Sequence, residues 1–84
     1  MNSKQQKIFS TLFDNPVKKN IKWSDIEKLI VGVGGQISQG DGSRVRIVIG
    51  GQSLNIHTPH PQKELKPYQV RAIRKLFIDQ GIKS

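Results

Sequence analysis

The feature that most constrains this fold is the segment RVRIVIGGQSLNIH at residues 44–57, where apolar and polar residues alternate on both sides of two glycines. Alternation is the period of a β-strand, so each strand should present one apolar and one polar face. Gly50-Gly51 matches a two-residue hairpin loop, because glycine adopts the positive φ angles that such loops need. We therefore expect an antiparallel hairpin that is covered on one face and open on the other.

The pairing across this hairpin sets basic residues beside a histidine. A two-residue loop would pair Arg44 with His57 and Arg46 with Asn55 on the polar face, while the apolar residues pair on the other face. A four-residue loop would instead pair Arg46 with His57 and would leave the faces unchanged. In either register, His57 has an arginine neighbour on the open face.

The segment before the hairpin, WSDIEKLIVGVGGQISQ, predicts a helix followed by a short strand. Ser24 and Glu27 match the capping box that begins many helices. The apolar residues after them recur at helical spacing, and Gly34-Gly35 should end the helix. QISQ at residues 36–39 is a candidate strand, and the Gly-Asp-Gly sequence after it predicts a turn into the hairpin.

The segment after the hairpin predicts the last helix. Pro67 suits the first turn, because proline lacks the N–H that this turn leaves unpaired, and Gly81 should end the helix after about Gln80. The apolar positions expected in the core are Val70, Ile73 and Phe77, with Leu76 at the edge. Beside them we expect a cationic stripe made of Arg71, Arg74 and Lys75.

The order of the elements predicts the fold class. A further helix is expected within residues 3–14, whose apolar residues recur at helical spacing until Asn15-Pro16 stops the pattern. The order is then helix, helix, strand, strand, strand, helix. Short connections make the simplest solution an α+β fold, a two-layer sandwich of a three-stranded antiparallel sheet with the helices on its apolar face. We expect a single domain over residues 1–84.

The charge balance points to a polyanion as the partner. The 84 residues include 14 Lys and Arg against 6 Asp and Glu, a net charge of +8, and all the arginines follow residue 42. Such a field attracts phosphate backbones, so nucleic acid is the leading candidate. The chain has no cysteine, which excludes disulfides, thiolate metal clusters and thiol catalysis. It has no apolar run that could span a membrane, and we expect a soluble cytoplasmic protein.

A histidine beside an arginine suits chemistry on RNA. Cleavage by the ribose 2′-hydroxyl needs a proton acceptor, a proton donor for the leaving oxygen and a cation at the phosphate. Histidine titrates near neutrality, and arginine binds phosphate through a planar fork. The alternative is that these side chains form only a solvated strand face. A metal site at His57 and His60 is not expected, because no cysteine or carboxylate cluster completes it.

Three segments follow one another along the chain: GDGSR at residues 40–44, HTPHP at residues 57–61 and KELKPYQVRAIRKLFIDQGI at residues 63–82. In this order, with the glycine hairpin between the first two, they resemble the HicA family of toxins from bacterial toxin–antitoxin pairs. The similarity covers residues 22–83 as a HicA-like core and makes residues 3–14 an N-terminal helical extension. The resemblance implies a double-stranded-RNA-binding-domain-like fold, ribonuclease activity on messenger RNA, and a HicB antitoxin that covers the active surface.

The sequence departs from the family pattern at Arg44. The family usually has Gly-Ser-His where this chain has Gly42-Ser43-Arg44, and the resemblance makes that histidine the catalytic residue. An arginine stays protonated at neutral pH and cannot act as an ordinary general base. His57 on the opposite strand offers a replacement, because directly opposed Cβ atoms lie about 4.5–5.5 Å apart and an imidazole there would occupy nearly the same volume.

The resulting hypothesis is a metal-independent ribonuclease without a cofactor, because the nucleophile belongs to the RNA itself. Its partners are messenger RNA and a HicB-like antitoxin. The predicted catalytic residues are His57 and His60, with Lys63 as an alternative to His60. The predicted RNA-binding residues are Ser43, Arg44, Arg46, Lys63, Lys66, Arg71, Arg74 and Lys75. Two alternatives are a non-catalytic RNA-binding module and a partner-docking domain that has lost nuclease activity.

Overall fold

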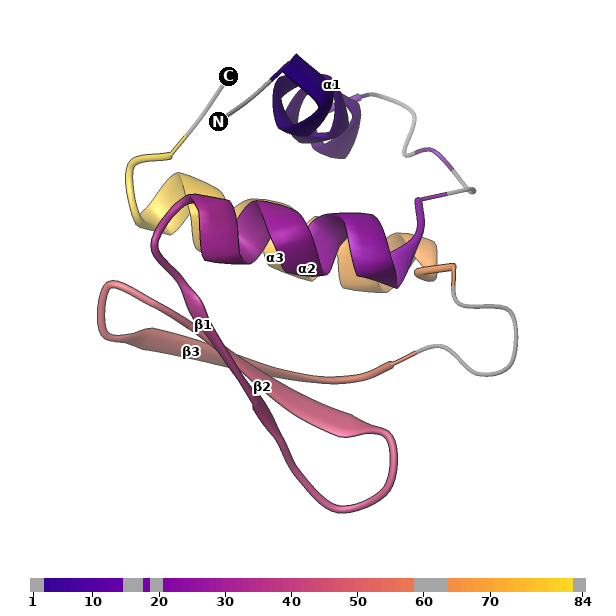
Figure 1. Ribbon diagram of the computed structural model, residues 1–84, viewed down its shortest axis with the longest axis vertical. Helices are drawn as coiled ribbons and strands as arrows, with labels where there is room; N and C mark the ends of the chain where they lie inside the picture. Colours follow the sequence, from indigo (N-terminus) through magenta and orange to yellow (C-terminus); the bar gives the residue numbers. More distant parts are fainter. Residues whose placement is uncertain (1–2, 15–17, 19–20, 59–63, 83–84) are drawn as a thin grey trace.

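The computed structural model describes residues 3–14, 18, 21–58 and 64–82. These residues form α1 (Ser3–Leu12), α2 (Trp23–Gly32), β1 (Gln36–Gln39), β2 (Arg44–Ile49), β3 (Gln52–His57) and α3 (Pro67–Asp79). Figure 1 shows α2 and α3 on one face of the sheet, and α1 on the far side of these two helices. The predicted α+β fold with a three-stranded antiparallel sheet is confirmed. None of the described helices is both long and apolar enough to cross a membrane.

Gly50 and Gly51 form the loop of the β2–β3 hairpin. Their φ angles are 56° and 88°, the two successive positive values that a type I′ turn requires. Across the turn, Arg44 pairs with His57. The two-residue loop is therefore confirmed, and the four-residue alternative is wrong. Because β1 pairs antiparallel with the other edge of β2, β2 is the central strand.

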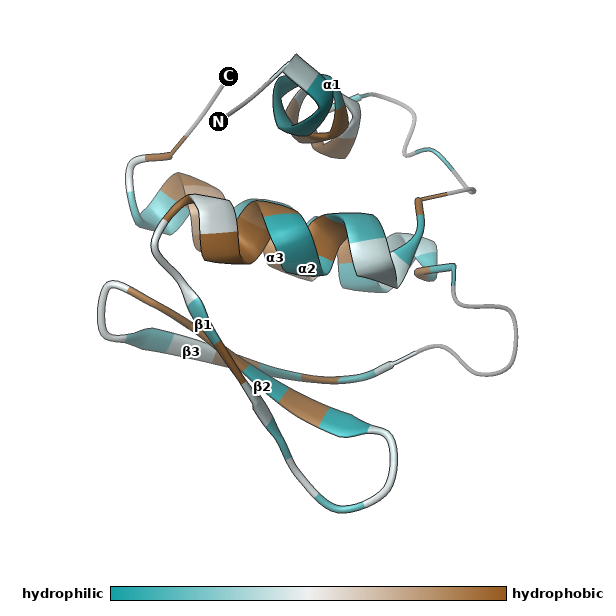
Figure 2. Cartoon of the chain, viewed as in Figure 1, coloured by the Kyte–Doolittle hydropathy of each residue, from teal (hydrophilic) through white to brown (hydrophobic). Residues whose placement is uncertain are grey.

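The apolar face of the sheet forms one wall of the core. Its buried residues are Val45, Ile47 and Ile49 on β2 and Ile56 on β3. Figure 2 shows the alternation of apolar and polar residues along β2. The facing wall comes from the helices, with Ile26, Leu29 and Ile30 of α2 and Val70, Ile73, Leu76 and Phe77 of α3. The expectation that Leu76 lies at the edge is wrong, because α3 is covered both by the sheet and by α1.

The predicted capping box at the start of α2 is wrong. The helix begins at Trp23, so Ser24 already lies inside the first turn, and the capping position is Lys22, whose side chain makes no capping hydrogen bond. The cause is a pairing with a distant segment. Lys22 forms an isolated β-bridge with Glu64, and this holds its backbone extended at φ −84° and ψ 140°. The helix can therefore begin only after Lys22.

Both α2 and α3 end at glycines, as predicted. Gly34 and Gly81 have φ angles of 89° and 75°, in the left-handed region that other residues rarely adopt. At the end of α3, the Ile82 N–H donates to the Phe77 carbonyl oxygen at 2.8 Å. Such bonds satisfy carbonyl groups that the end of a helix leaves free.

Two kinds of contact hold α1 against α3. The ring of Phe9 lies 5.8 Å from the ring of Phe77, centroid to centroid, and both side chains are buried. The Arg74 guanidinium donates from Nε to the Leu12 carbonyl oxygen at 3.0 Å and from Nη2 to the Asp14 carbonyl oxygen at 3.1 Å. A cation is favourable there, because the carbonyls at the end of a helix carry partial negative charge. α1 is therefore part of the packed structure.

A third contact ties the end of α3 to the hairpin loop. Gln52 Nε2 donates to the Asp79 carboxylate at 3.1 Å, and Lys75 Nζ forms an ion pair with the same carboxylate at 3.2 Å. The hydrogen bond from Gln52 and the one from Lys75 lower the pKa of Asp79 below its usual value. Because folding lowers this pKa, the carboxylate contributes stability at neutral pH, and the contribution is lost as the pH falls through the folded-state pKa.

Replacement of Phe9 by alanine should lower the free energy of unfolding by about 3 kcal/mol, because it leaves a cavity between α1 and α3. Chemical denaturation followed by circular dichroism measures this change. The matched control is Val31→Ala on α2, whose side chain is 60% exposed and whose loss should change stability by less than about 0.5 kcal/mol. Equal effects of the two variants would contradict the packing of α1.

The Gln52→Met variant should raise the pKa of Asp79 toward its usual value, because it removes the largest cause of the lowering. An NMR titration of the Asp79 carboxyl carbon measures this pKa. Ser53→Ala, one position further along β3, is the control and should leave the titration unchanged. An Asp79 pKa that does not respond to Gln52→Met would rule out this tie between α3 and the hairpin.

Candidate nucleic-acid interface

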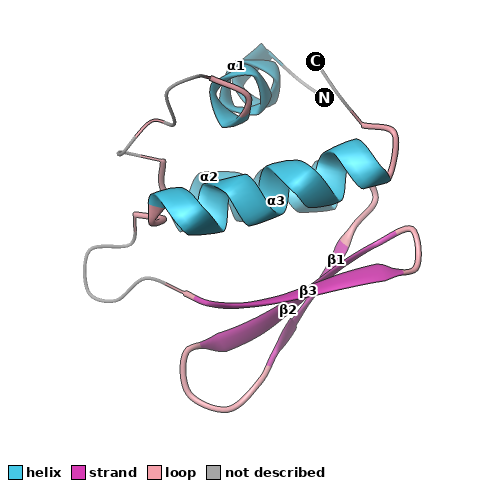
Figure 3. Ribbon diagram, turned by 180° about the vertical axis from the view of Figure 1, so that it is seen from behind, coloured by secondary structure: helices cyan, strands magenta, loops and turns pink. Residues whose placement is uncertain are grey.

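The face of the sheet away from the helices is an open polar surface. Figure 1 and the reverse view in Figure 3 show that no described helix lies over it. Its residues alternate with the buried ones and are aligned by the strand register: Gln36, Ser38, Arg44, Arg46, Val48, Ser53, Asn55 and His57. We call this set the open sheet face. It carries two arginines and one histidine and has no acidic residue, so it suits a phosphate backbone.

Arg44 and His57 lie directly opposite each other at one end of this face. The next pair outward is hydrogen bonded, since the Thr58 N–H donates to the Ser43 carbonyl oxygen at 2.8 Å. Antiparallel pairs alternate, so Arg44 and His57 form a non-hydrogen-bonded pair, the type in which Cα atoms are closest, at about 4.5 Å. Both side chains are exposed. A cation and an imidazole therefore stand side by side and accessible to a ligand.

Arg46 extends the positive surface along the central strand. It lies between Ser38 on β1 and Asn55 on β3. His57 is its diagonal neighbour on β3, and diagonal neighbours on one face lie about 7–8 Å apart, within reach of a long side chain. A phosphate bound beside His57 can thus receive hydrogen bonds from both arginines of the open sheet face.

Ser43 holds the end of the hairpin together through its backbone. Its carbonyl oxygen accepts from the Thr58 N–H and, at 3.0 Å, from the Thr58 hydroxyl. The Ser43 side chain is half-buried in the turn before β2. This residue therefore lies at the Arg44–His57 end of the sheet, and its backbone helps to fix that end. Its RNA-binding role stays a prediction.

The cations predicted on α3 do not form one stripe. Arg71 and Lys75 are exposed, and Lys75 is paired with Asp79 at 3.2 Å. Arg74 is half-buried and donates to two carbonyl oxygens at the end of α1. The predicted stripe is therefore wrong in Arg74, because its guanidinium is already engaged in the packing of α1. The RNA-binding roles of all three residues stay predictions.

Lys66 and Tyr68 lie at the start of α3. Lys66 is exposed and precedes the first helical residue, and Tyr68 is 62% exposed. The α3 terminus that bears them is the one nearest to His57, because Gln69 in its first turn contacts the His57 carbonyl oxygen. A cation and an aromatic ring thus lie near the Arg44–His57 end of the sheet.

Gln69 is a contact residue that the sequence patterns did not single out. Its side chain is 3% exposed, and it joins α3 to the end of β3 by donating from Nε2 to the His57 carbonyl oxygen at 2.7 Å. Its Oε1 accepts from the Lys66 N–H at 3.0 Å. The sequence did contain a sign of this contact. Gln69 stands at helical spacing from Ile73, on the side of α3 that faces the core, where a polar side chain needs a hydrogen-bond partner.

His60 and Lys63 lie outside the described residues, so their predicted roles stay predictions. Among the residues that the structure does describe, no three His, Cys, Asp or Glu side chains come together in a way that could hold a metal ion. Of the predicted site residues that the structure describes, Arg44, Arg46 and His57 lie on the open sheet face, and Lys66 lies at the start of α3.

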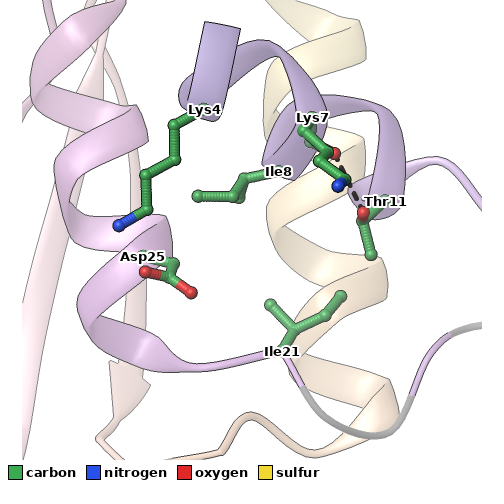
Figure 4. Close-up of a pocket in the computed structure, with 6 residues that line it drawn as sticks. All are labelled: Lys4, Lys7, Ile8, Thr11, Ile21 and Asp25. Atoms are coloured by element: carbon green, nitrogen blue, oxygen red, sulfur yellow. Dashed lines mark hydrogen bonds between the residues drawn. The ribbon is translucent and has the colours of Figure 1, made fainter.

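A hollow of about 400 Å³ lies between α1 and the start of α2. It is lined by Lys4, Lys7, Ile8, Thr11, Ile21 and Asp25. Figure 4 shows the Lys4 side chain extending toward Asp25, with Ile8 and Ile21 between α1 and the chain that enters α2. Because α1 lies on the far side of the helical layer from the sheet, this hollow is separate from the open sheet face.

Residues 23–80 of the chain match the family model described as HicA toxin of bacterial toxin-antitoxin. The match begins at the first residue of α2 and ends one residue after α3, so it includes the whole sheet and excludes α1. Neither the curated proteins nor the solved structures contained a match to this chain.

Replacement of Arg46 by alanine should weaken binding to RNA and reduce the slope of log affinity against log salt by about 1, because one phosphate contact is lost. Fluorescence anisotropy with a labelled RNA at several salt concentrations measures both quantities. Lys7→Ala removes the same charge from α1, on the other side of the helical layer, and should change the slope far less. Equal slopes for the two variants would argue against binding at the open sheet face.

Proposed function

This chain belongs to the HicA toxin family, the toxins of bacterial toxin–antitoxin pairs, and we propose that it is a metal-independent endoribonuclease that cleaves messenger RNA. The observation that supports this activity is the pairing of Arg44 with His57 on the open sheet face. One of these side chains can hold a phosphate, and the other can exchange a proton with the ribose. The two are neighbours across one pair of strands.

The reaction follows from the chemistry of RNA. His57 accepts the proton of the 2′-hydroxyl, and the 2′-oxygen attacks the neighbouring phosphorus. A bond from the 2′-oxygen to phosphorus forms while the bond to the 5′-oxygen breaks, which leaves a 2′,3′-cyclic phosphate. The 5′-oxygen takes a proton from His60 or Lys63. No metal-bound water is needed, because the nucleophile is part of the substrate.

In this reaction, Arg44 and Arg46 stabilise the negative charge on the phosphate oxygens. A guanidinium donates hydrogen bonds in a fixed planar fork that matches two phosphate oxygens. Negative charge on those oxygens grows as the phosphorus becomes five-coordinate, so donors held in place stabilise the transition state more than the ground state. Arg44 cannot serve as the base, and His57 on the opposite strand supplies that role instead.

A HicB-like antitoxin is the proposed partner. The net charge of +8 and the absence of acidic residues from the open sheet face favour a partner with an acidic docking surface. Such a protein would neutralise the toxin by covering Arg44 and His57, and charge complementarity would speed its association.

Arg44 also favours a second candidate function. An arginine where the family usually has its catalytic histidine fits an RNA-binding or partner-docking domain that has lost nuclease activity. This alternative predicts RNA binding that weakens steeply with salt and no cleavage.

His57→Ala should lower the cleavage of a labelled messenger RNA by about 100-fold or more, because it removes the proton acceptor, while the dissociation constant for RNA stays within about twofold. Fragment lengths on a sequencing gel, with EDTA present, measure the cleavage. Asn55→Ala, a neighbour on the same strand face, is the control and should retain most of the activity. Loss of binding together with cleavage would contradict the assignment of His57, and cleavage by neither wild type nor variant would favour the second candidate function.

A double variant tests whether a histidine at position 44 can replace the one at position 57. Arg44→His in the His57→Ala background returns a histidine to the family's usual position, on the strand opposite to residue 57. Because the two positions are paired, we expect this double variant to recover measurable cleavage over His57→Ala. A double variant no more active than His57→Ala would show that the two positions are not interchangeable.

A further inference from the structure

Gln69 occupies a position where an apolar residue would be the default. It lies in the first turn of α3, directly before buried Val70, and it is the one buried polar side chain among the residues that the structure describes. A buried amide is costly unless its donor and acceptor are both satisfied. Both are, because Nε2 donates to the His57 carbonyl oxygen at 2.7 Å and Oε1 accepts from the Lys66 N–H at 3.0 Å. The side chain thus links the end of β3 to the start of α3.

The contact with His57 acts on a peptide group that is also held from the other side. The His57 carbonyl and the Thr58 N–H belong to the same peptide unit. Its carbonyl oxygen accepts from Gln69, and its N–H donates to the Ser43 carbonyl oxygen at 2.8 Å. Because a peptide unit is planar and rigid, holding both ends fixes the backbone directly after His57. β3 ends at this point, where a strand would otherwise fray.

The two hydrogen bonds of the Gln69 side chain do not lie on the open sheet face. Gln69 belongs to α3, which lies on the covered side of the sheet in Figure 1. The His57 side chain is exposed and, by the strand register, lies on the open sheet face beside Arg44. Gln69 therefore cannot touch an RNA bound at Arg44. Its influence on that site has to pass through the backbone of His57.

We infer that Gln69 is a positioning residue for RNA cleavage, which holds the His57 backbone so that the imidazole stays beside Arg44. The inference rests on the proposed function of His57 as the acid–base group. The same side chain sets Lys66 relative to His57, because one amide bonds both backbones. Misplacement of a catalytic group by about 1 Å can lower a rate by about 100-fold, so a single lost hydrogen bond at this point has a measurable effect.

The test compares Gln69→Met with Gln80→Met. Methionine is nearly as long as glutamine, but it cannot donate a hydrogen bond to the His57 carbonyl oxygen. It also lacks the amide oxygen that accepts from the Lys66 N–H. Gln80 is the matched control, because it is half-buried at the other end of α3 and its Nε2 donates to Gln52 Oε1 at 2.8 Å. The cleavage rate at saturating RNA and the dissociation constant for RNA are measured below the melting temperature of every variant. A variant Gln69→Leu replaces Gln69→Met if the latter does not fold.

We expect Gln69→Met to lower the saturated cleavage rate about 10- to 100-fold with the RNA dissociation constant within about twofold. Gln80→Met should leave both within about twofold. Hydrogen exchange of the Thr58 amide should become faster in Gln69→Met and not in Gln80→Met, which tests the backbone anchor without reference to activity.

Three results would overturn the inference. A normal cleavage rate in Gln69→Met would do so, with the proposed function intact. Equal losses of rate in Gln69→Met and Gln80→Met would show a general effect on α3 rather than positioning of His57. A wild-type protein that does not cleave RNA would overturn the proposed function and this inference together. The wild-type measurement alone shows this result, so it cannot be confused with the other two, in which the wild type is active.

Discussion

The structure depends on the register between β2 and β3, which the two glycines of the loop set. A shift of one residue in this register would exchange the two faces of one strand. Val45 and Ile47 would then face water, and Arg44 would face the core. The same two-residue turn therefore decides both the hydrophobic core and the pairing of Arg44 with His57. Gly50 and Gly51 make it possible, because both positions need φ angles that other residues rarely adopt.

The last helix holds the hairpin at both ends of β3. Near the loop, Gln52 bonds to Asp79 and accepts from Gln80, and at the far end Gln69 bonds to the His57 carbonyl. A strand at the edge of a small sheet has few other constraints on its ends. In the proposed arrangement, the bond from Gln69, at the end of β3 that bears His57, is the one that keeps the exposed imidazole in a defined position. It also connects the packing of the helices to the chemistry proposed on the opposite face of the sheet.

In the proposed function, Arg44 stands where the family resemblance implies a catalytic histidine, and this changes the roles of the two paired positions. In the proposed arrangement, the position that usually supplies the imidazole supplies a fixed positive charge, and the imidazole comes from the opposite strand as His57. The exchange is geometrically simple, because the two positions form a close antiparallel pair. Arg44 also adds a cation to a described face that has no acidic residue, and such a charge attracts a polyanion such as the proposed RNA substrate or the proposed acidic antitoxin.

The sequence by itself determined the strands, the polar and apolar faces of the hairpin, an arginine neighbour for His57 and the glycine ends of α2 and α3, because each depends on alternation or turn chemistry among neighbouring residues. The structure decided between the two possible loop lengths, and so paired His57 with Arg44 rather than with Arg46. Only the tertiary structure decided the start of α2, the engagement of Arg74 with α1 and the link from Gln69 to His57. In each of these cases the partner is distant in the chain, or comes close only after the helices pack. No local pattern records which backbone carbonyl such a side chain will meet, so those contacts become visible only when the layers are assembled.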